Sequence, residues 1–269
     1  MGRLGVDYRH VITYNFGSYR MGKIVARLGL WMGVMMLVAH AHAQENVTTF
    51  GIQVRPIIPS KFFNSGTEIV EEGDLELVVD PRVGYNFGMV MRRGFTRFFS
   101  LETGISLVRR NYNLSFTHRA YNETLQIKHA FVGYEVPVQG LIYVRLGDRV
   151  WMNGSAGVSF DFYPSNTFES ANNQRDTLTF VFEQRTNRLN WVQVALMANY
   201  GFEFRTKKAG YFYLGATYHR PFSPIARSKS TYVLSGFPTT LETELSGSYL
   251  TLDFRYYFHE DPERKKKMK

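Results

Sequence analysis

The chain has 269 residues, of which 44% are hydrophobic and 16% aromatic, and it contains no Cys. This apolar content excludes a disordered chain, the mean hydropathy of -0.24 excludes a bundle of membrane helices, and the lack of Cys excludes disulfide scaffolds and thiolate sites. The formal charge is +9, but residues 1–43 carry five of the 32 basic and one of the 23 acidic side chains, which leaves 27 against 22, or +5. We therefore expect no nucleic-acid partner.

An export signal is predicted over residues 21–43. Two basic residues precede a 12-residue apolar run over 28–39, and the sequence Ala-His-Ala then ends at Ala43. This order is typical of a secretory signal peptide, with cleavage between Ala43 and Gln44. The apolar run is shorter than the roughly 20 residues of a membrane helix, so an uncleaved anchor is the weaker alternative. Residues 1–20 lack signal character, and Met21 is an alternative start of the chain.

After the signal peptide, apolar and polar residues alternate with a period of two, which predicts β-strands. In Val192–Phe204, for example, every second residue from Val192 is apolar, whereas the intervening positions include Gln193, Asn199 and Glu203. The predicted strands are Thr48–Pro59, Val83–Met91, Leu101–Leu107, Thr124–Arg145, Val150–Phe162, Val192–Phe204, Gly210–Phe222 and Leu250–Phe258.

The connections between these strands alternate between long and short. The long gaps are 60–81, 111–123, 164–188 and 223–245, and the short gaps are 94–96, 146–148 and 206–209. Outer-membrane barrels show this asymmetry, with short periplasmic turns and long external loops. We predict an all-β fold, an eight-stranded antiparallel up-and-down transmembrane β-barrel over residues 44–258. Both termini are then periplasmic, and the basic segment 259–269 forms a solvated periplasmic tail.

Alternation alone does not decide which face is inside, so a soluble lipocalin-like barrel is the rival fold. Two features favour apolar side chains toward lipid. The polar faces are rich in Gly, Ser and Asn, which fit the narrow lumen of an eight-stranded barrel. Aromatic residues gather near strand ends, as in membrane girdles. The barrel-closing strand is the clearest case, with Phe254, Tyr256 and Phe258 on one face.

Strand parity places a set of charged residues in the lumen. A lone buried charge is costly, so these residues are expected to pair. The predicted lumen charges are Arg55, Glu102, Glu135, Asp161, Glu203, Asp253 and Arg255, together with His129 and His219. Lys128 has the opposite parity and is predicted to face outward. We favour a structural network over a proton path or a catalytic site.

No motif indicates an enzyme. The four His residues after the signal peptide have no metal-ligand spacing, and neither a nucleophile elbow nor a phosphate-binding Gly loop is present. We therefore expect no catalytic residue, metal or cofactor, although His118 lies in a long gap where rim enzymes carry their sites. In the 164–188 gap, Phe180 and Phe182 are predicted to form a contact patch for a partner protein. The alternative is that this gap and 223–245 extend the strands as hairpins.

Three features resemble the outer-membrane β-barrel family of the Bacteroidota: the signal ending in Ala-Gln, the segment Tyr134–Val138, and the closing strand Gly247–Phe258. Within that family the chain is most similar to the PorT group of barrels, which are associated with the type IX secretion system. The resemblance implies a non-enzymatic accessory in secretion and maturation of cell-surface proteins, with gingipain-type proteases as cargo. Its partners would be outer-membrane lipid, other secretion-system proteins and secreted cargo.

The long gaps and the basic tail depart from that family pattern, so two alternatives stay open. One is a structural barrel or adhesin of the outer membrane, and the other is an outer-membrane enzyme with a rim or lumen site. Pro137, within the resembling segment, removes one ladder hydrogen bond, and a β-bulge is expected beside it.

Overall fold

The computed structural model describes residues 48–258, apart from 61–65, 97, 176–177 and 207–208. The predicted signal peptide, its cleavage site at Ala43 and the basic tail lie outside these residues. Within the described part of the chain, no helix is both long and apolar enough to cross a membrane.

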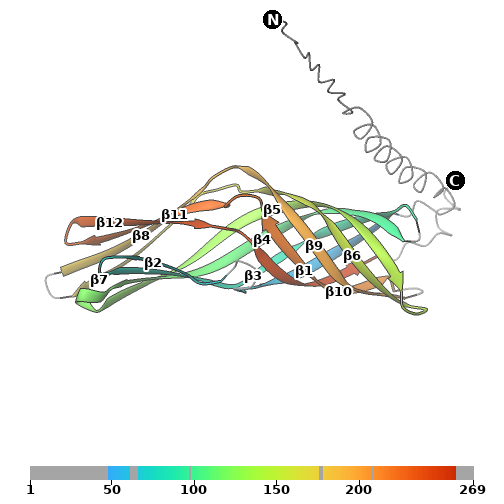
Figure 1. Ribbon diagram of the computed structural model, residues 1–269, viewed down its shortest axis with the longest axis horizontal. Coiled ribbons are helices and arrows are strands. Elements are labelled where there is room, and N and C mark those ends of the chain that lie inside the picture. Colours follow the sequence, from blue (N-terminus) through green and yellow to red (C-terminus); the bar gives the residue numbers. More distant parts are fainter. Residues whose placement is uncertain (1–47, 61–65, 97, 176–177, 207–208, 259–269) are drawn as a thin grey trace, which may run out of the picture. The chain divides into compact units, whose positions relative to one another are not determined.

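Eight antiparallel strands form a closed ring (Figure 1). The ring is closed because β1 pairs with β13 on one side and with β3 on the other. In spatial order the strands are β1 (Thr48–Ile58), β13 (Tyr249–Tyr257), β10 (Tyr211–Pro221), β9 (Val192–Arg205), β6 (Val150–Phe162), β5 (Glu123–Arg145), β4 (Phe99–His118) and β3 (Leu75–Gly94). The predicted eight-stranded barrel is confirmed, and no sheet edge is left in this ring.

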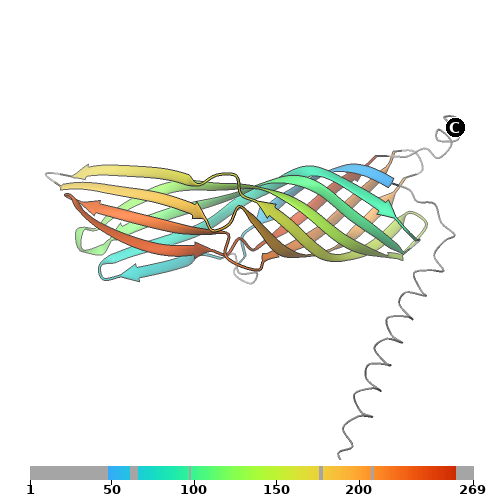
Figure 2. The same cartoon turned by 90° about the horizontal axis from the view of Figure 1, so that it is seen from above.

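In their described residues, the long connections contain five further strands and a short 3-10 helix, η2 (Arg119–Tyr121), all at one end of the ring (Figure 2). These strands are β2 (Glu68–Glu72), β7 (Thr167–Arg175), β8 (Leu178–Arg188), β11 (Ala226–Leu234) and β12 (Phe237–Leu245). A four-stranded sheet has the order β12-β11-β8-β7, and β2 pairs with the first half of β3. The long gaps are therefore hairpins, as the alternative interpretation held. We call this part of the molecule, with the adjoining halves of β3, β4 and β5, the extension.

The three short turns lie at the opposite end of the ring. They connect β3 to β4, β5 to β6 and β9 to β10. The described chain also begins and ends there, because Thr48 pairs with Arg93 beside the β3–β4 turn and the backbone N–H of Phe258 donates to the carbonyl of Phe50 at 2.8 Å. The predicted asymmetry of the connections is confirmed.

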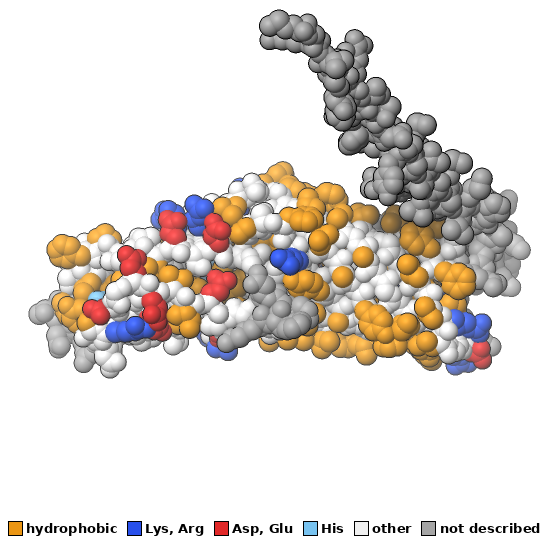
Figure 3. Space-filling view, viewed as in Figure 1, with side chains coloured by type: hydrophobic (Ala, Val, Ile, Leu, Met, Phe, Trp, Pro, Cys, Tyr) orange, Lys and Arg blue, Asp and Glu red, His pale blue; other side chains and the backbone are white. Residues whose placement is uncertain are grey.

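Strand β4 shows how the two parts differ. Its even-numbered residues face inward along its whole length, but Glu102 and Ser106 are buried in the ring, whereas Leu114 and Phe116 are buried in the extension. On the outer face, Ile105 is 53% exposed in the ring. On the face that Figure 3 shows, hydrophobic side chains cover much of the ring, and most of the charged side chains lie on the extension. The polar inside and apolar outside of the ring are thus reversed beyond it.

The extension has a hydrophobic core between its two sheets, and Phe180 and Phe182 belong to this core. They are 1% and 0% exposed, and the ring of Phe182 lies 5.2 Å from that of Phe116 on β4. The prediction that they form a partner-contact patch is therefore wrong. Both residues lie on the inward face of β8, where alternate positions cover the core.

The change of character is accompanied by a register shift in β3. Between Arg82 and Tyr85 the pairing with β4 slips by one residue. As a result, odd-numbered residues such as Leu77 face inward before the shift and even-numbered residues such as Arg92 face inward after it. The bulge expected at Pro137 is absent, because the β4–β5 register is the same on both sides of that residue.

Candidate functional site

The lumen of the ring holds the polar groups that the sequence placed there. All seven predicted charges are buried, with exposed fractions between 0% and 4%. His219 is also buried in the ring, His129 is buried in the extension, and Lys128 is exposed as expected. These charges fall into two groups at different heights along the barrel.

The first group, which we call the turn-side cluster, consists of Arg92, Glu102, Glu203, Asp253 and Arg255. Arg92 is 3.0 Å from Glu102 and also pairs with Glu203. Arg255 pairs with Glu102 and lies 2.6 Å from Asp253. Each carboxylate in this cluster therefore contacts a guanidinium group, and the acceptors that remain on Asp253 receive hydrogen bonds from hydroxyl groups of Thr residues.

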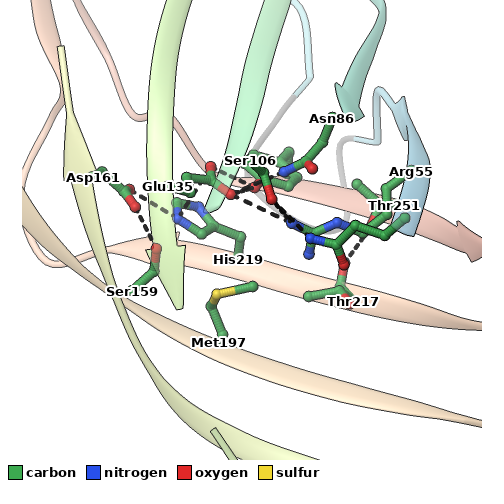
Figure 4. A network of polar contacts seen from close by, with 12 residues as sticks. Arg55, Asn86, Ser106, Glu135, Ser159, Asp161, Met197, Thr217, His219 and Thr251 are labelled. Carbon is green, nitrogen blue, oxygen red and sulfur yellow. Dashed lines mark hydrogen bonds and ion pairs between the residues drawn. The ribbon is translucent and has the colours of Figure 1, made fainter. Parts of the chain in front are cut away.

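The second group, the extension-side cluster, is centred on Glu135 (Figure 4). Arg110 lies 3.3 Å and Arg55 3.8 Å from its carboxylate. The Tyr249 hydroxyl donates to the same carboxylate at 2.6 Å. His219 lies between Glu135 and Asp161, with Nε2 2.9 Å from Asp161 Oδ2 and 3.7 Å from Glu135 Oε1. The imidazole also stacks on the Tyr249 ring at 4.5 Å.

Both clusters cross the lumen. Arg92 is on β3 and Glu203 on β9, which are four steps apart in the ring of eight, and the same holds for Glu135 on β5 and Tyr249 on β13. Contacts between strands four apart span the diameter of the ring. The side chains therefore occlude the lumen at two levels, as the small interior of an eight-stranded barrel favours.

Glu135, Asp161 and His219 bring their ligand atoms within 4.8 Å of one another, which is a spacing that a metal ion could use. Two features oppose a dication there. The guanidinium groups of Arg55 and Arg110 lie beside Glu135, and the Tyr249 hydroxyl already occupies its oxygens. The group is better suited to neutralise the two Arg residues than to bind a metal.

Two further His residues of the described chain, His118 and His129, lie in the extension. His129 Nε2 is 3.3 Å from the hydroxyl of Thr167, and burial lowers the pKa of His129 to about 4. His118 ends β4 and stacks edge-on against Tyr121 at 4.7 Å. Their neighbours are a hydroxyl group and aromatic rings, and the structure does not bring His118 or His129 together with the lumen charges.

Four residues that contact the lumen charges were missed by the sequence analysis: Arg92, Arg110, Tyr249 and Tyr257. Arg92 and Arg110 have the lumen parity of their strands, but the predicted strands ended before them at Met91 and Leu107. The two Tyr residues have the inward parity of the closing strand, and the Tyr257 hydroxyl donates to Glu102 at 2.6 Å. If the predicted strands had been extended past Met91 and Leu107, parity would have placed Arg92 and Arg110 in the lumen. Parity of the closing strand would have placed the two Tyr residues there as well.

A closed ring of eight antiparallel strands, apolar outside and ion-paired inside, defines a transmembrane β-barrel. The family model described as outer membrane protein beta-barrel domain matches residues 43–227. This chain belongs to that family, and its place is the outer membrane.

Among solved structures, the chain is similar to the outer membrane protein OprG from Pseudomonas aeruginosa. The two share 10% sequence identity with a TM-score of 0.44, over 82% of this chain and 99% of OprG. A search of curated proteins found no match.

Proposed function

We propose that this chain is a non-enzymatic membrane anchor that presents the extension outside the cell as an accessory in secretion and maturation of cell-surface proteins. The observation that carries the proposal is the combination of an occluded lumen with a folded extension. The narrower assignment, to the type IX secretion system with gingipain-type proteases as cargo, follows from the resemblance to PorT. Its partners would be other secretion-system proteins and the secreted cargo.

The occluded lumen argues against a diffusion pore. The ion pair of Arg92 with Glu203 and the hydrogen bond from Tyr249 to Glu135 cross the ring, so a solute would have to break buried polar contacts. The Glu135, Asp161 and His219 group equally disfavours a lumen enzyme, because Arg110 and the Tyr249 hydroxyl already engage the carboxylate of Glu135 and because His219 is paired with Asp161. The barrel then serves mainly to hold the extension at the membrane.

The tip of the extension offers a surface for a partner. Phe237 is 80% and Tyr121 43% exposed, and both line a hollow of about 300 Å³ beside the turn between β11 and β12. A contiguous exposed apolar surface, such as this hollow with Leu178 and Leu234 in its lining, marks an interaction site, and aromatic residues are enriched among those that dominate binding energy. We assign the partner contact to this tip in place of the buried Phe180 and Phe182.

The proposal is tested by complementing a deletion strain and measuring type IX cargo activity at the cell surface. The full chain is expected to restore surface activity. The double variant Phe237→Ser and Tyr121→Ser is expected to assemble as a heat-modifiable barrel without restoring it. Phe168→Ser, which removes a side chain 54% exposed on β7, is the matched control and should restore activity. Normal secretion in the deletion strain would reject this function and favour a structural barrel or adhesin.

The proposed orientation, with both termini periplasmic, has a separate test, since the chain contains no native Cys. Asp74→Cys, in the β2–β3 turn, should react with a membrane-impermeant maleimide on whole cells. Asp148→Cys, in a short turn where the side chain is 96% exposed, should react only after the outer membrane is permeabilised. The reverse pattern would mean that the extension faces the periplasm.

A further inference from the structure

We propose that a pocket where the barrel meets the extension binds the carboxylate of a single-chain amphiphile of the fatty-acid type. The pocket lies between the end of β1, the first half of β3, β4 and the start of β13. Its walls are formed by Ile57, Val79, Arg110, Tyr112, Leu245 and Tyr249, and exposed Glu68 and Arg82 stand at its rim. It therefore runs from the surface to the extension-side cluster.

Arg110 is the reason to expect an anion. It is 4% exposed, and only its Nη2 reaches a carboxylate, Glu135 at 3.3 Å. Its Nε and Nη1 are buried and have no hydrogen-bond partner among the described residues. Buried polar groups without partners are costly, and those of a charged group are costlier still. A ligand oxygen at this position would supply the missing acceptor.

Arg110 also shares its carboxylate partner with a second guanidinium group. Arg110 and Arg55 share the carboxylate of Glu135, and Asp161 is paired with His219. Arg110 is further framed by the rings of Tyr249 and Tyr163, whose centroids lie 5.0 Å and 5.9 Å from its guanidinium carbon. Aromatic faces stabilise the cation but offer no acceptor for its N–H groups.

The size of the pocket selects a small head group. The pocket has room of about 40 Å³ for water-sized groups, which holds roughly three of them at about 10–15 Å³ each. A carboxylate has three heavy atoms and fits this space better than a phosphate does. Ile57, Val79 and Leu245 are apolar walls of the same pocket and suit the first carbon next to the carboxylate, so the rest of the alkyl chain would lie outside the pocket.

The position of the pocket relative to lipid suggests where the chain comes from. On β3, the residues next to the pocket on the outer face are Val83, 65% exposed, and Tyr85, 43% exposed, which begin the lipid-facing band. An amphiphile in the membrane interface could thus place its carboxylate at Arg110 and keep its chain against apolar surface. This inference does not depend on a role in secretion.

The test uses the full chain, purified in neutral detergent micelles, with decanoate as the probe. Binding is measured by native mass spectrometry, with empty micelles as the background. One decanoate per chain is expected, and decanol, acetate and inorganic phosphate should each bind at least 10-fold more weakly. Decanol binding as tightly as decanoate would overturn the carboxylate assignment, and phosphate binding as tightly would show that any small anion is accepted and would overturn the amphiphile assignment.

Three variants locate the site. Arg110→Gln is expected to weaken decanoate binding at least 10-fold, whereas Arg109→Gln, one residue away with an exposed side chain, should leave it unchanged. Because Arg110→Gln disturbs a buried cluster, Glu68→Gln provides a second test at the exposed rim and should tighten binding by removing a like charge. No saturable binding to the unaltered chain, or equal binding by the Arg109→Gln and folded Arg110→Gln variants, would reject the site.

Discussion

The barrel and the extension are built from the same strands but stabilised in opposite ways. In the barrel the inward side chains are ion-paired, as Glu102 and Arg255 show, and the outward ones are apolar. In the extension the inward side chains are apolar, as Phe116 and Phe182 show, and the outward ones are polar. Strand β4 passes through both parts without changing which of its residues face inward. The surroundings, lipid or water, therefore decide which kind of residue each face carries.

This comparison explains why the chain tolerates so many buried charges. Lipid supplies no hydrophobic driving force between the walls of the barrel, so the lumen is held by hydrogen bonds and ion pairs across its diameter. Above the membrane the same walls face water, and burial of apolar side chains becomes the main stabilising term. The two parts should accordingly respond in different ways to the same kind of substitution.

The largest effect is expected from removing a lumen carboxylate. Glu102→Ala leaves Arg92 and Arg255 without their shared partner, and breaking such a buried pair costs about 3–5 kcal/mol. The measurement is the free energy of unfolding by urea in lipid vesicles. Glu242→Ala, which breaks an exposed ion pair with Lys229 in the extension, is the control and should change it little. Similar losses in both variants would mean that the lumen pairs contribute no more than surface pairs.

A lysine on the outer face of β4 should show the next largest contrast. Ile105→Lys places a charge in the lipid-facing band and is expected to cost about 2–4 kcal/mol. Ser115→Lys puts the same side chain on the same face of the same strand, ten residues further along, in the extension. It should lower the free energy of unfolding by no more than about 0.5 kcal/mol. The same urea titration measures both. Equal costs would contradict the boundary between lipid and water drawn here.

A smaller effect concerns pH and is confined to the extension. Burial lowers the pKa of His129 from 6.5 to about 4, so the unfolded segment binds a proton between those values that the folded one does not. The contribution of neutral His129 to the free energy of unfolding of the extension is complete above pH 6.5. It falls as the pH drops toward 4, by about 1–2 kcal/mol at pH 5. Hydrogen exchange of the β5 and β7 amides at pH 7 and pH 5 measures this loss.

His129→Gln is the control for this prediction, because an amide retains a polar contact with Thr167 without titrating in this range. The variant should lose most of the pH dependence of exchange in β5 and β7. If the pH dependence of hydrogen exchange is unchanged in this variant, other groups cause it, and the role given to His129 is contradicted.

Much of the barrel could be predicted from the sequence, because a strand that separates lipid from a polar lumen shows clean alternation. The alternation from Val192 to Phe204 and the three short turns led to the right ring, and parity led to the buried charges. The register shift between Arg82 and Tyr85 was not detectable, since it moves the inward face by one residue without breaking the apolar pattern.

The hairpins of the extension were an open alternative, but its apolar core was missed because the rule of apolar side chains outward does not hold there. Its strands carry the pattern of a soluble sheet, and Phe180 and Phe182 were taken as exposed because they lay in a gap between predicted membrane strands. The alternation of Leu178, Phe180 and Phe182 with Thr179, Val181 and Glu183 already indicates a strand with one apolar face. The partners of Phe182, such as Phe116, lie far away in the sequence, and only the folded chain brings them together.

The most direct test of the account is a scan of single cysteines along β4, each carrying a nitroxide, in the otherwise Cys-free chain in lipid vesicles. Labels at 101, 105 and 107 should be accessible to oxygen dissolved in lipid, and labels at 111, 113 and 115 to a water-soluble nickel chelate. Labels at 102, 106, 114 and 116 should be shielded from both. Chelate access at 105, or lipid contact at even-numbered positions, would contradict the reversal of faces between barrel and extension.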